Sequence, residues 1–275
     1  MADLAEGRSR ADLHIHTVAS DGTATVSAIL DHVERLTDLS VIAITDHERI
    51  DAAVAARAMA GDRGLRVEVI VGEEVTTLGG HLLALYIDGP IRPYRSLRAT
   101  IAAVHDAGGL AIPAHPLVPY PLCAQGWVLR RLLDDADPAV HPDALETFNP
   151  TTLGRPAHKR VTQFADEQGL AHVGNSDAHA LAAIASGWTA FPGHDAADLR
   201  RAIETCATEH GGTFHPTVGQ LGTFGRQLRK RGRDARDELG GRLRRDGTGR
   251  DHGYPGGRLR PPRFEQAGPE ERRRP

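Results

Sequence analysis

The chain has 275 residues, a formal net charge of −3 at pH 7 and a hydrophobic content of 40%. This charge gives no overall attraction to nucleic acid or to a membrane surface, and an aromatic content of only 4% argues against a stacking platform for bases. Histidine is frequent, with 15 residues, whereas the 2 cysteines are too few for a disulfide framework and favour a reducing compartment.

The N-terminal residues lack the apolar run of a signal peptide, and no stretch is long and apolar enough for a transmembrane helix. We therefore expect a cytoplasmic protein without membrane contact.

The first predicted strand carries two histidines. Residues 12–16 alternate polar and apolar side chains, so His14 and His16 point to the same face of the strand. Asp21 follows in a Ser-Asp-Gly turn. Two neighbouring imidazoles with a carboxylate close behind favour a metal site over a pair of half-exposed surface histidines.

Short apolar strands and amphipathic helices then alternate along the chain. The further predicted strands cover residues 41–44, 66–71, 82–87, 110–112, 143–148, 169–173 and 188–191. The predicted helices cover residues 26–36 with Thr25 as N-cap, 51–60, 96–107, 127–133, 156–168 and 196–206. This alternation predicts a parallel α/β architecture closed into a barrel of about seven strands, with an eight-stranded TIM-like barrel as the alternative.

Polar side chains gather where these strands begin or end, which is where α/β barrels place their chemistry. The candidates are Asp46 and His47, Glu73 and Glu74, His81, His115, Glu146, and Asp177 with His179. Only one of the adjacent acids Glu73 and Glu74 needs to reach a site, and the other could be a surface carboxylate. Asp46 is expected to orient a ligand, and Glu146 to support a ligand, contact substrate or serve the structure.

From about residue 219 the chain is rich in Arg, Gly and Pro and poor in large apolar residues. Such a composition cannot bury enough surface to fold, so residues 219–275 are predicted to form a disordered tail. The tail is basic. A solvated tail without a partner is favoured over weak contact with nucleic acid.

The order of these motifs, from Asp-Leu-His-Ile-His and Ser-Asp-Gly through Thr-Asp-His, Gly-Glu-Glu and Pro-Ala-His-Pro to Asn-Ser-Asp-Ala-His, resembles the PHP (polymerase and histidinol phosphatase) superfamily over residues 10–207. The resemblance implies a distorted (β/α)7 barrel with up to three divalent metal ions, zinc, manganese or iron, at its C-terminal mouth. It implies a first ion held by His14, His16, Glu74 and Asp177, a second by Glu74, His81 and His115, and a third by Asp21, His47 and His179.

The resemblance also implies a metal-dependent phosphoesterase, in which a metal-bridged hydroxide hydrolyses a phosphomonoester, a small nucleotide or a short oligonucleotide. Asp177 and His179 would take part in catalysis. Arg155 is a candidate phosphate clamp, with a surface arginine as the alternative. A histidinol-phosphate phosphatase, a non-catalytic PHP module and a metal-dependent amidohydrolase remain as alternative functions.

Overall fold

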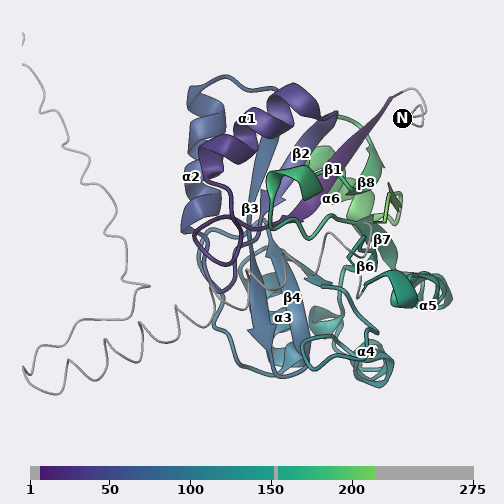
Figure 1. Ribbon diagram of the computed structural model, residues 1–275. Helices are drawn as coiled ribbons and strands as arrows, with labels where there is room; N and C mark the ends of the chain where they lie inside the picture. The colour runs from purple at the N-terminus through teal and green to yellow at the C-terminus, as the bar shows by residue number, and fades with distance from the viewer. Residues whose placement is uncertain (1–6, 152–153, 215–275) are drawn as a thin grey trace, which may run out of the picture. The chain divides into compact units, whose positions relative to one another are not determined.

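In the computed structural model, residues 7–151 and 154–214 are described, and this part contains nine strands and six α-helices (Figure 1). The strands are β1 (Arg8–Ile15), β2 (Leu39–Ile44), β3 (Glu68–Thr77), β4 (Gly80–Leu85), β5 (Leu110–Pro113), β6 (Ala144–Phe148), β7 (Ala171–Gly174), β8 (Gly187–Pro192) and β9 (Glu209–Gly212). The helices are α1 (Val26–Leu36), α2 (Asp51–Asp62), α3 (Leu97–Asp106), α4 (Gly126–Leu133), α5 (Gly154–Gln168) and α6 (Ala196–Glu204). The predicted tail, residues 219–275, lies outside the described residues.

Seven strands form one sheet in the order β5-β4-β3-β2-β1-β8-β9, and β6 pairs with β7 in a second sheet. The two sheets are joined on both sides. The amide of Asp143, just before β6, donates to the carbonyl of Ala111 in β5 (3.0 Å). The amide of Gly174 in β7 donates to the hydroxyl of Thr189 in β8 (3.0 Å). The strands therefore curl into the distorted α/β barrel that the sequence predicted.

Strand directions differ from the wholly parallel arrangement that we expected. β1, β2 and β3 run parallel, but β4 is antiparallel to both of its neighbours and β8 is antiparallel to β1. Only Leu78 and Gly79 separate β3 from β4. A parallel connection needs a crossover of roughly a dozen residues or more, so this short turn forces a hairpin.

One strand is longer than the sequence predicted, and one strand was not predicted at all. β3 continues to Thr77 instead of ending at Val71, which places Glu73 and Glu74 inside a paired strand. β9 was not predicted, because its sequence Glu-His-Gly-Gly lacks the apolar alternation of a strand.

Helices α1 and α2 lie side by side next to β2 and β3 (Figure 1). The N-cap of α1 is Thr25, as predicted, and its hydroxyl accepts a hydrogen bond from the amide of Ala28 (3.3 Å). Ile29 and Val33 of α1 are buried in one apolar cluster with Ile42 of β2. This packing fixes the strand ends from which the histidines project. No helix in the described part of the chain is long and apolar enough to cross a bilayer.

Candidate metal centre

His14 and His16 lie at the C-terminal end of β1 with fully buried side chains. The backbone beyond this strand still has a partner, because the amide of His16 donates to the carbonyl of Ala178 (2.9 Å) and the amide of Ala178 donates to the carbonyl of His14 (3.1 Å). This pairing holds the segment that carries Asp177 and His179 against the two histidines. Residues more than 160 positions apart in the sequence are thereby brought into one site.

Two carboxylate oxygens lie near the Nε2 atoms of both β1 histidines, and the donor atoms of His14, His16 and Asp177 lie within 4.8 Å of one another. The Nε2 atoms of His14 and His16 each lie 3.4 Å from Oε2 of Glu74 and 3.5 Å from Oδ1 of Asp177. These distances are too long for strong hydrogen bonds. The Nε2 atoms of both histidines are buried and have no hydrogen-bond partner among the described residues.

This spacing fits a metal ion. Ligand atoms about 2.0–2.2 Å from a tetrahedral metal lie about 3.3–3.6 Å from one another, and each histidine Nε2 lies at this separation from each of the two carboxylate oxygens. Two imidazoles with two carboxylates are a suitable donor set for zinc, manganese or iron. The residues present therefore fit the first ion that the resemblance implies.

The other oxygen of Glu74 faces a second pair of histidines. Its Oε1 lies 2.7 Å from Nδ1 of His81 and 3.1 Å from Nε2 of His115. Glu74 thus directs one oxygen to each of two groups of donors, which is the arrangement of a carboxylate that bridges two ions.

A third group forms around Asp21. Its Oδ1 lies 3.1 Å from Nε2 of His179 and 3.6 Å from Nδ1 of His16, and these donor atoms lie within 4.8 Å of one another. His47 stands between two groups, with its Nε2 3.7 Å from Asp21 and its Nδ1 3.3 Å from Glu74. Donor atoms of His47, His16 and Glu74 lie within 4.8 Å of one another, whereas the corresponding group around Asp21 and His179 includes His16 and not His47.

Two of these residues have a left-handed backbone, with φ of 33° at His115 and 51° at Asp177. Residues other than glycine are uncommon in this region, and a rigid surrounding structure is needed to hold them there. At both positions the backbone turns sharply after a strand, and the side chain enters the cluster.

Glu146, in the middle of β6, supports the cluster from behind. Its Oε1 accepts from Nδ1 of His14 (2.9 Å) and from the side-chain amide of Asn175 (2.9 Å). Its Oε2 accepts from the backbone amide of His115 (2.6 Å) and from the side-chain amide of Asn149 (3.0 Å). A proton on Nδ1 of His14 leaves the Nε2 lone pair for a metal, so this carboxylate sets the tautomer of the histidine.

The sequence left the role of Glu146 open, and it gave no signal for Asn175 beyond its place in the Asn-Ser-Asp-Ala-His motif. Asn175 also accepts a hydrogen bond from the amide of Leu13 through its side-chain oxygen (3.1 Å). It therefore links β1 to the segment after β7.

Asp46 holds the loop after β1. Its carboxylate accepts from the amide (2.8 Å) and the hydroxyl (2.7 Å) of Thr17, and also from the hydroxyl of Ser20. Ser20 precedes Asp21. Asp46 thus orients a candidate ligand through the loop, in the supporting role expected for it.

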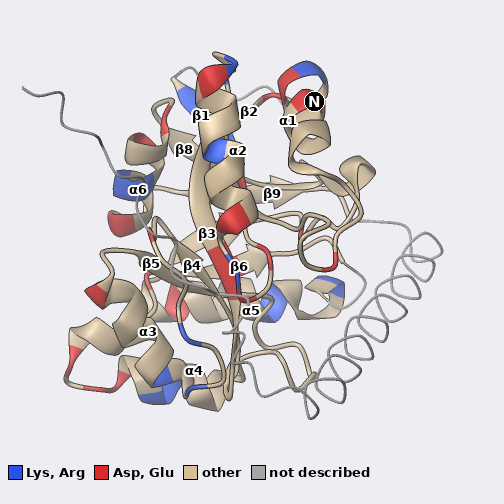
Figure 2. Cartoon of the chain, turned by 90° about the vertical axis from the view of Figure 1, so that its left-hand side faces the viewer, with Lys and Arg blue, Asp and Glu red and all other residues tan. Residues whose placement is uncertain are grey.

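Glu73 is not a surface carboxylate, which corrects one of the two alternatives left open for it. Its side chain is fully buried on the opposite face of β3 from Glu74, and one oxygen accepts a hydrogen bond from the amide of Ile91. Burial raises the pKa of Glu73 to about 8. Figure 2 shows this acidic stretch of β3 in the middle of the protein, flanked by helices.

Arg155, the candidate phosphate clamp, lies exposed near the start of α5. Its guanidinium stands over the ring of Phe214, 5.3 Å from the ring centre. Its role as a clamp stays a prediction. Six of the histidines that match no motif have contacts elsewhere: His105 with Asp143, His141 with Asp135, His158 and His210 with Thr147, His172 with Asp166, and His194 with Ser9.

The charges in the cluster favour the ionised form of its carboxylates. Burial opposes ionisation of Glu74 and Asp177, but the neighbouring histidines outweigh it and lower both pKa values well below their usual range. Burial also lowers the pKa of His47 to about 3, so its ring is neutral at pH 7. Although burial acts in the other direction, the pKa of His14 is raised well above 6.5 by the charges of the surrounding carboxylates, and that of His115 by its hydrogen bonds with Cys123 and Glu74.

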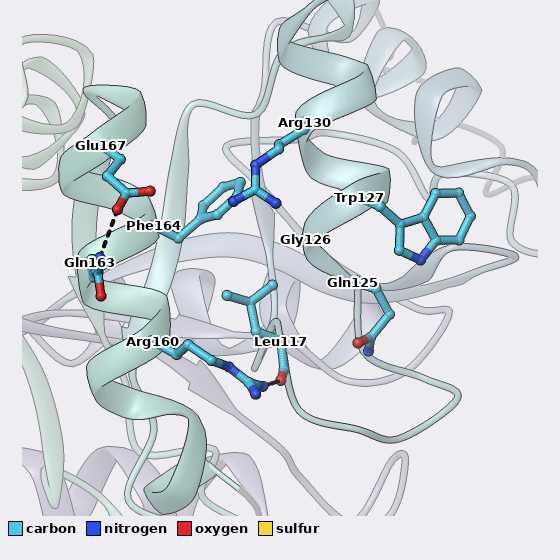
Figure 3. Close-up of a pocket in the computed structure, with 9 residues that line it drawn as sticks. All are labelled: Leu117, Gln125, Gly126, Trp127, Arg130, Arg160, Gln163, Phe164 and Glu167. Carbon is cyan, nitrogen blue, oxygen red and sulfur yellow. Dashed lines mark hydrogen bonds between the residues drawn. The ribbon is translucent and has the colours of Figure 1, made fainter.

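A separate cavity of about 530 Å³ lies between α4 and α5 (Figure 3). Its lining contains Leu117, Trp127, Arg130, Arg160 and Phe164 but none of the nine clustered residues. The guanidinium of Arg130 covers the ring of Phe164 at 5.1 Å. This cavity is therefore distinct from the candidate metal centre.

The chain is similar to known proteins in sequence. A family model described as PHP-associated (PHP_C) matches residues 155–208. An uncharacterized protein of Methanocaldococcus jannaschii is 32% identical over 151 residues, which cover 51% of this chain and 81% of that protein. The 5'-3' exoribonuclease Rnm of Escherichia coli is 39% identical over 83 residues, which cover 28% of this chain and only 27% of that enzyme.

The chain is also similar in fold to a solved structure from Bacteroides vulgatus, a two-domain protein containing a predicted PHP-like metal-dependent phosphoesterase. The TM-score is 0.62 at 17% identity, over 75% of this chain and 65% of the other. At this identity the likeness concerns the fold alone. The match of residues 155–208 to the PHP-associated family model, together with the histidines and carboxylates gathered at the strand ends, leads to one conclusion: the chain belongs to the PHP superfamily.

Proposed function

We propose that this protein is a metal-dependent phosphoesterase that hydrolyses a phosphomonoester, a small nucleotide or a short oligonucleotide. The observation that carries the proposal is the position of Glu74, whose two oxygens face separate groups of donor atoms. Up to three divalent ions, zinc, manganese or iron, would be held by His14, His16, Asp21, His47, Glu74, His81, His115, Asp177 and His179.

Divalent ions held this close together would supply an activated water molecule and positive charge for the phosphoryl group. The residues of the chain would bind and orient these ions. Glu146 keeps a proton on Nδ1 of His14, and Asp46 keeps the loop that carries Asp21 in place. No serine or cysteine is needed as a nucleophile in such a reaction.

The exposure of the side chains indicates where a substrate would enter. His14 and His16 are fully buried, whereas His47, His115, Asp177 and His179 are 12–16% exposed. These four residues form the rim of the cluster toward solvent. We infer that the phosphoryl group approaches over this rim, and that Asp177 and His179 contact the reacting atoms.

A nucleotide substrate is supported by two observations. The chain shares 39% identity over 83 residues with an enzyme described as a 5'-3' exoribonuclease. The Ser-Asp-Gly form of the turn at Asp21 resembles the branch of the superfamily that cleaves nucleotides and small phosphoesters. A cytoplasmic location and weak nucleic-acid contact through residues 219–275 stay predictions.

The test is a substrate panel with the purified full chain after loading with Mn²⁺ or Zn²⁺. The panel contains 5′-phosphorylated short RNA, a nucleoside 3′,5′-bisphosphate, histidinol phosphate and a chromogenic phosphomonoester. We expect turnover of the nucleotide substrates, and loss of that turnover together with bound metal in His14→Ala. His172→Ala is the matched control, because His172 pairs with Asp166 outside the cluster (3.1 Å).

Faster turnover of histidinol phosphate than of the nucleotides would favour the alternative function, a histidinol-phosphate phosphatase. If the metal-loaded protein hydrolyses no substrate in the panel, the proposed phosphoesterase activity is refuted and a non-catalytic module is favoured.

A further inference from the structure

The contact of His115 on the side away from Glu74 is unusual for a candidate ligand. Its Nδ1 lies 3.2 Å from the sulfur of Cys123, while its Nε2 lies 3.1 Å from Glu74. Histidines that bind metals commonly direct their second nitrogen to a carboxylate, a backbone carbonyl or water. His14 follows that pattern with Glu146. At His115 a buried thiol, 5% exposed, takes that position.

The position of the proton on the His115 ring determines which hydrogen bond the Cys123 thiol can form with it. When the lone pair of Nε2 binds a metal, a neutral imidazole carries its proton on Nδ1, and this N–H can donate to the sulfur of Cys123. When Nε2 instead carries the proton and donates to Glu74, the thiol S–H can donate to Nδ1. A thiol can therefore form a hydrogen bond with Nδ1 of the ring in both states, whereas an apolar side chain can form one in neither.

The loop that carries Cys123 is fixed, so the sulfur has a defined position. The amide of Leu117 donates to the carbonyl of Ala124 (2.8 Å), and the side-chain amide of Gln125 donates to the carbonyl of Cys123 (2.9 Å). Arg160 of α5 donates to the carbonyl of Leu117 from the edge of the cavity in Figure 3. These contacts close the loop behind His115.

The same loop also touches the strand of the other histidine in this group. The amide of His81 donates to the carbonyl of Leu122 (2.8 Å), next to Cys123 in the sequence. One loop thus contacts both histidines that face Oε1 of Glu74.

We propose that Cys123 is a positioning residue for the second metal ion, whose sulfur holds the Nδ1 edge of the His115 ring so that Nε2 faces Glu74. The proposal rests on the proposed function only in taking Glu74, His81 and His115 as metal ligands. Loss of such a partner in other metal sites weakens metal affinity about 10–100-fold, and we expect the same range here.

The experiment measures bound metal rather than activity. Full-length protein is dialysed against a series of buffered free Zn²⁺ concentrations, and metal ions per chain are counted by elemental analysis. In Cys123→Ala, the weakest-bound ion that depends on His115 should need about 10–100-fold more free Zn²⁺. Cys123→Ser, whose hydroxyl can both accept and donate, should restore binding to near the wild-type curve.

Two controls separate positioning from packing. Cys206→Ala removes the other cysteine, which is exposed, and should leave the binding curve unchanged. Cys123→Val fills the buried space but has no polar atom on its side chain. If the sulfur positions the ring, this variant should weaken metal binding as much as Cys123→Ala does. If the loss in Cys123→Ala came only from a loosened loop, Cys123→Val should bind metal normally. Thermal melts of the metal-free proteins show whether each variant is folded.

A double-mutant cycle gives the sharpest readout. His115→Ala lacks the ring that Cys123 is proposed to hold, so adding Cys123→Ala to it should cause no further loss of metal. Wild-type binding by Cys123→Ala, or an equal loss in the His115→Ala background, would overturn the proposal. Because metal retention is read without a substrate, a failure of phosphoester hydrolysis in the wild-type protein would leave this result intact and distinguishable.

Discussion

Glu74 is the residue on which the geometry of the cluster depends most. Its carboxylate lies within 3.4 Å of nitrogen atoms from five histidines, His14, His16, His47, His81 and His115. Closely spaced cations repel one another strongly in a buried site, and the negative charge of Glu74 offsets that repulsion. A neutral side chain of the same shape would keep the oxygen but lose the charge.

Glu74→Gln should therefore lose at least one bound metal ion and roughly 10²-fold or more in rate, the size seen when electrostatic stabilisation is removed from an active site. Metal counting and turnover on the same preparation check this. Full metal content with near wild-type turnover in this variant would mean that Glu74 bridges nothing.

Glu73→Gln is the matched control from the next position in β3. Since the pKa of Glu73 is raised to about 8 by burial, this residue is protonated at pH 7, and glutamine should replace it with little change in metal content. The folded wild-type protein holds a proton that the unfolded chain releases, so its free energy of unfolding should fall as pH rises between 4.5 and about 8. Denaturant unfolding across this range should show a smaller fall in the variant, and an unchanged slope would contradict the buried, protonated state.

At the scale of elements, the loop after β1 depends on Gly22. A Cβ at this position would lie 2.3 Å from the carbonyl oxygen of His16 and 2.9 Å from the amide nitrogen of Thr17. Both are backbone atoms of the strand end that carries the histidines, so neither can move aside cheaply. The close approach of this loop to β1 places Asp21 beside His16 and His179.

Gly22→Ala should therefore destabilise the fold by about 1–3 kcal/mol and displace Asp21, with loss of the third metal ion before the first. Gly61→Ala is the control, because Gly61 lies in α2 with nothing within 4 Å of an added Cβ. That change should be neutral or stabilise by up to about 1 kcal/mol. Chemical denaturation and metal counting on both variants decide it, and equal effects of the two substitutions would show that the loop is not tightly constrained.

The elements that the sequence predicted well are those with local signals. The alternation around His14 and His16, the cap at Thr25 and the apolar run of β2 each follow from neighbouring residues. The hydrogen bonds of Glu146 could not be derived in this way, because its partners His14 and Asn175 come from β1 and from the segment after β7. These contacts arise only when the barrel closes.

For the whole molecule, the barrel assembles a site that holds protons when it is free of metal. The pKa of His14 is raised well above 6.5 by neighbouring carboxylates and that of His115 by Cys123 and Glu74, so both rings carry extra protons at neutral pH in the metal-free protein. A metal ion must displace these protons, and its affinity should therefore fall as the pH is lowered.

Titration calorimetry with Zn²⁺ in two buffers of different ionisation enthalpy measures this release. We expect at least one proton released per chain at pH 7 and weaker binding at pH 6. The same affinity at both pH values, with no proton released, would show that the ligands are already deprotonated in the free protein.

We propose that one cluster at the strand ends holds closely spaced metal ions. Anomalous X-ray diffraction from crystals of the Mn²⁺- or Zn²⁺-loaded protein tests it most directly. We expect a first anomalous peak in contact with Nε2 of His14, Nε2 of His16 and Oε2 of Glu74, and a second beside Oε1 of Glu74 with His81 and His115. Loaded crystals without an anomalous peak among these residues would contradict it.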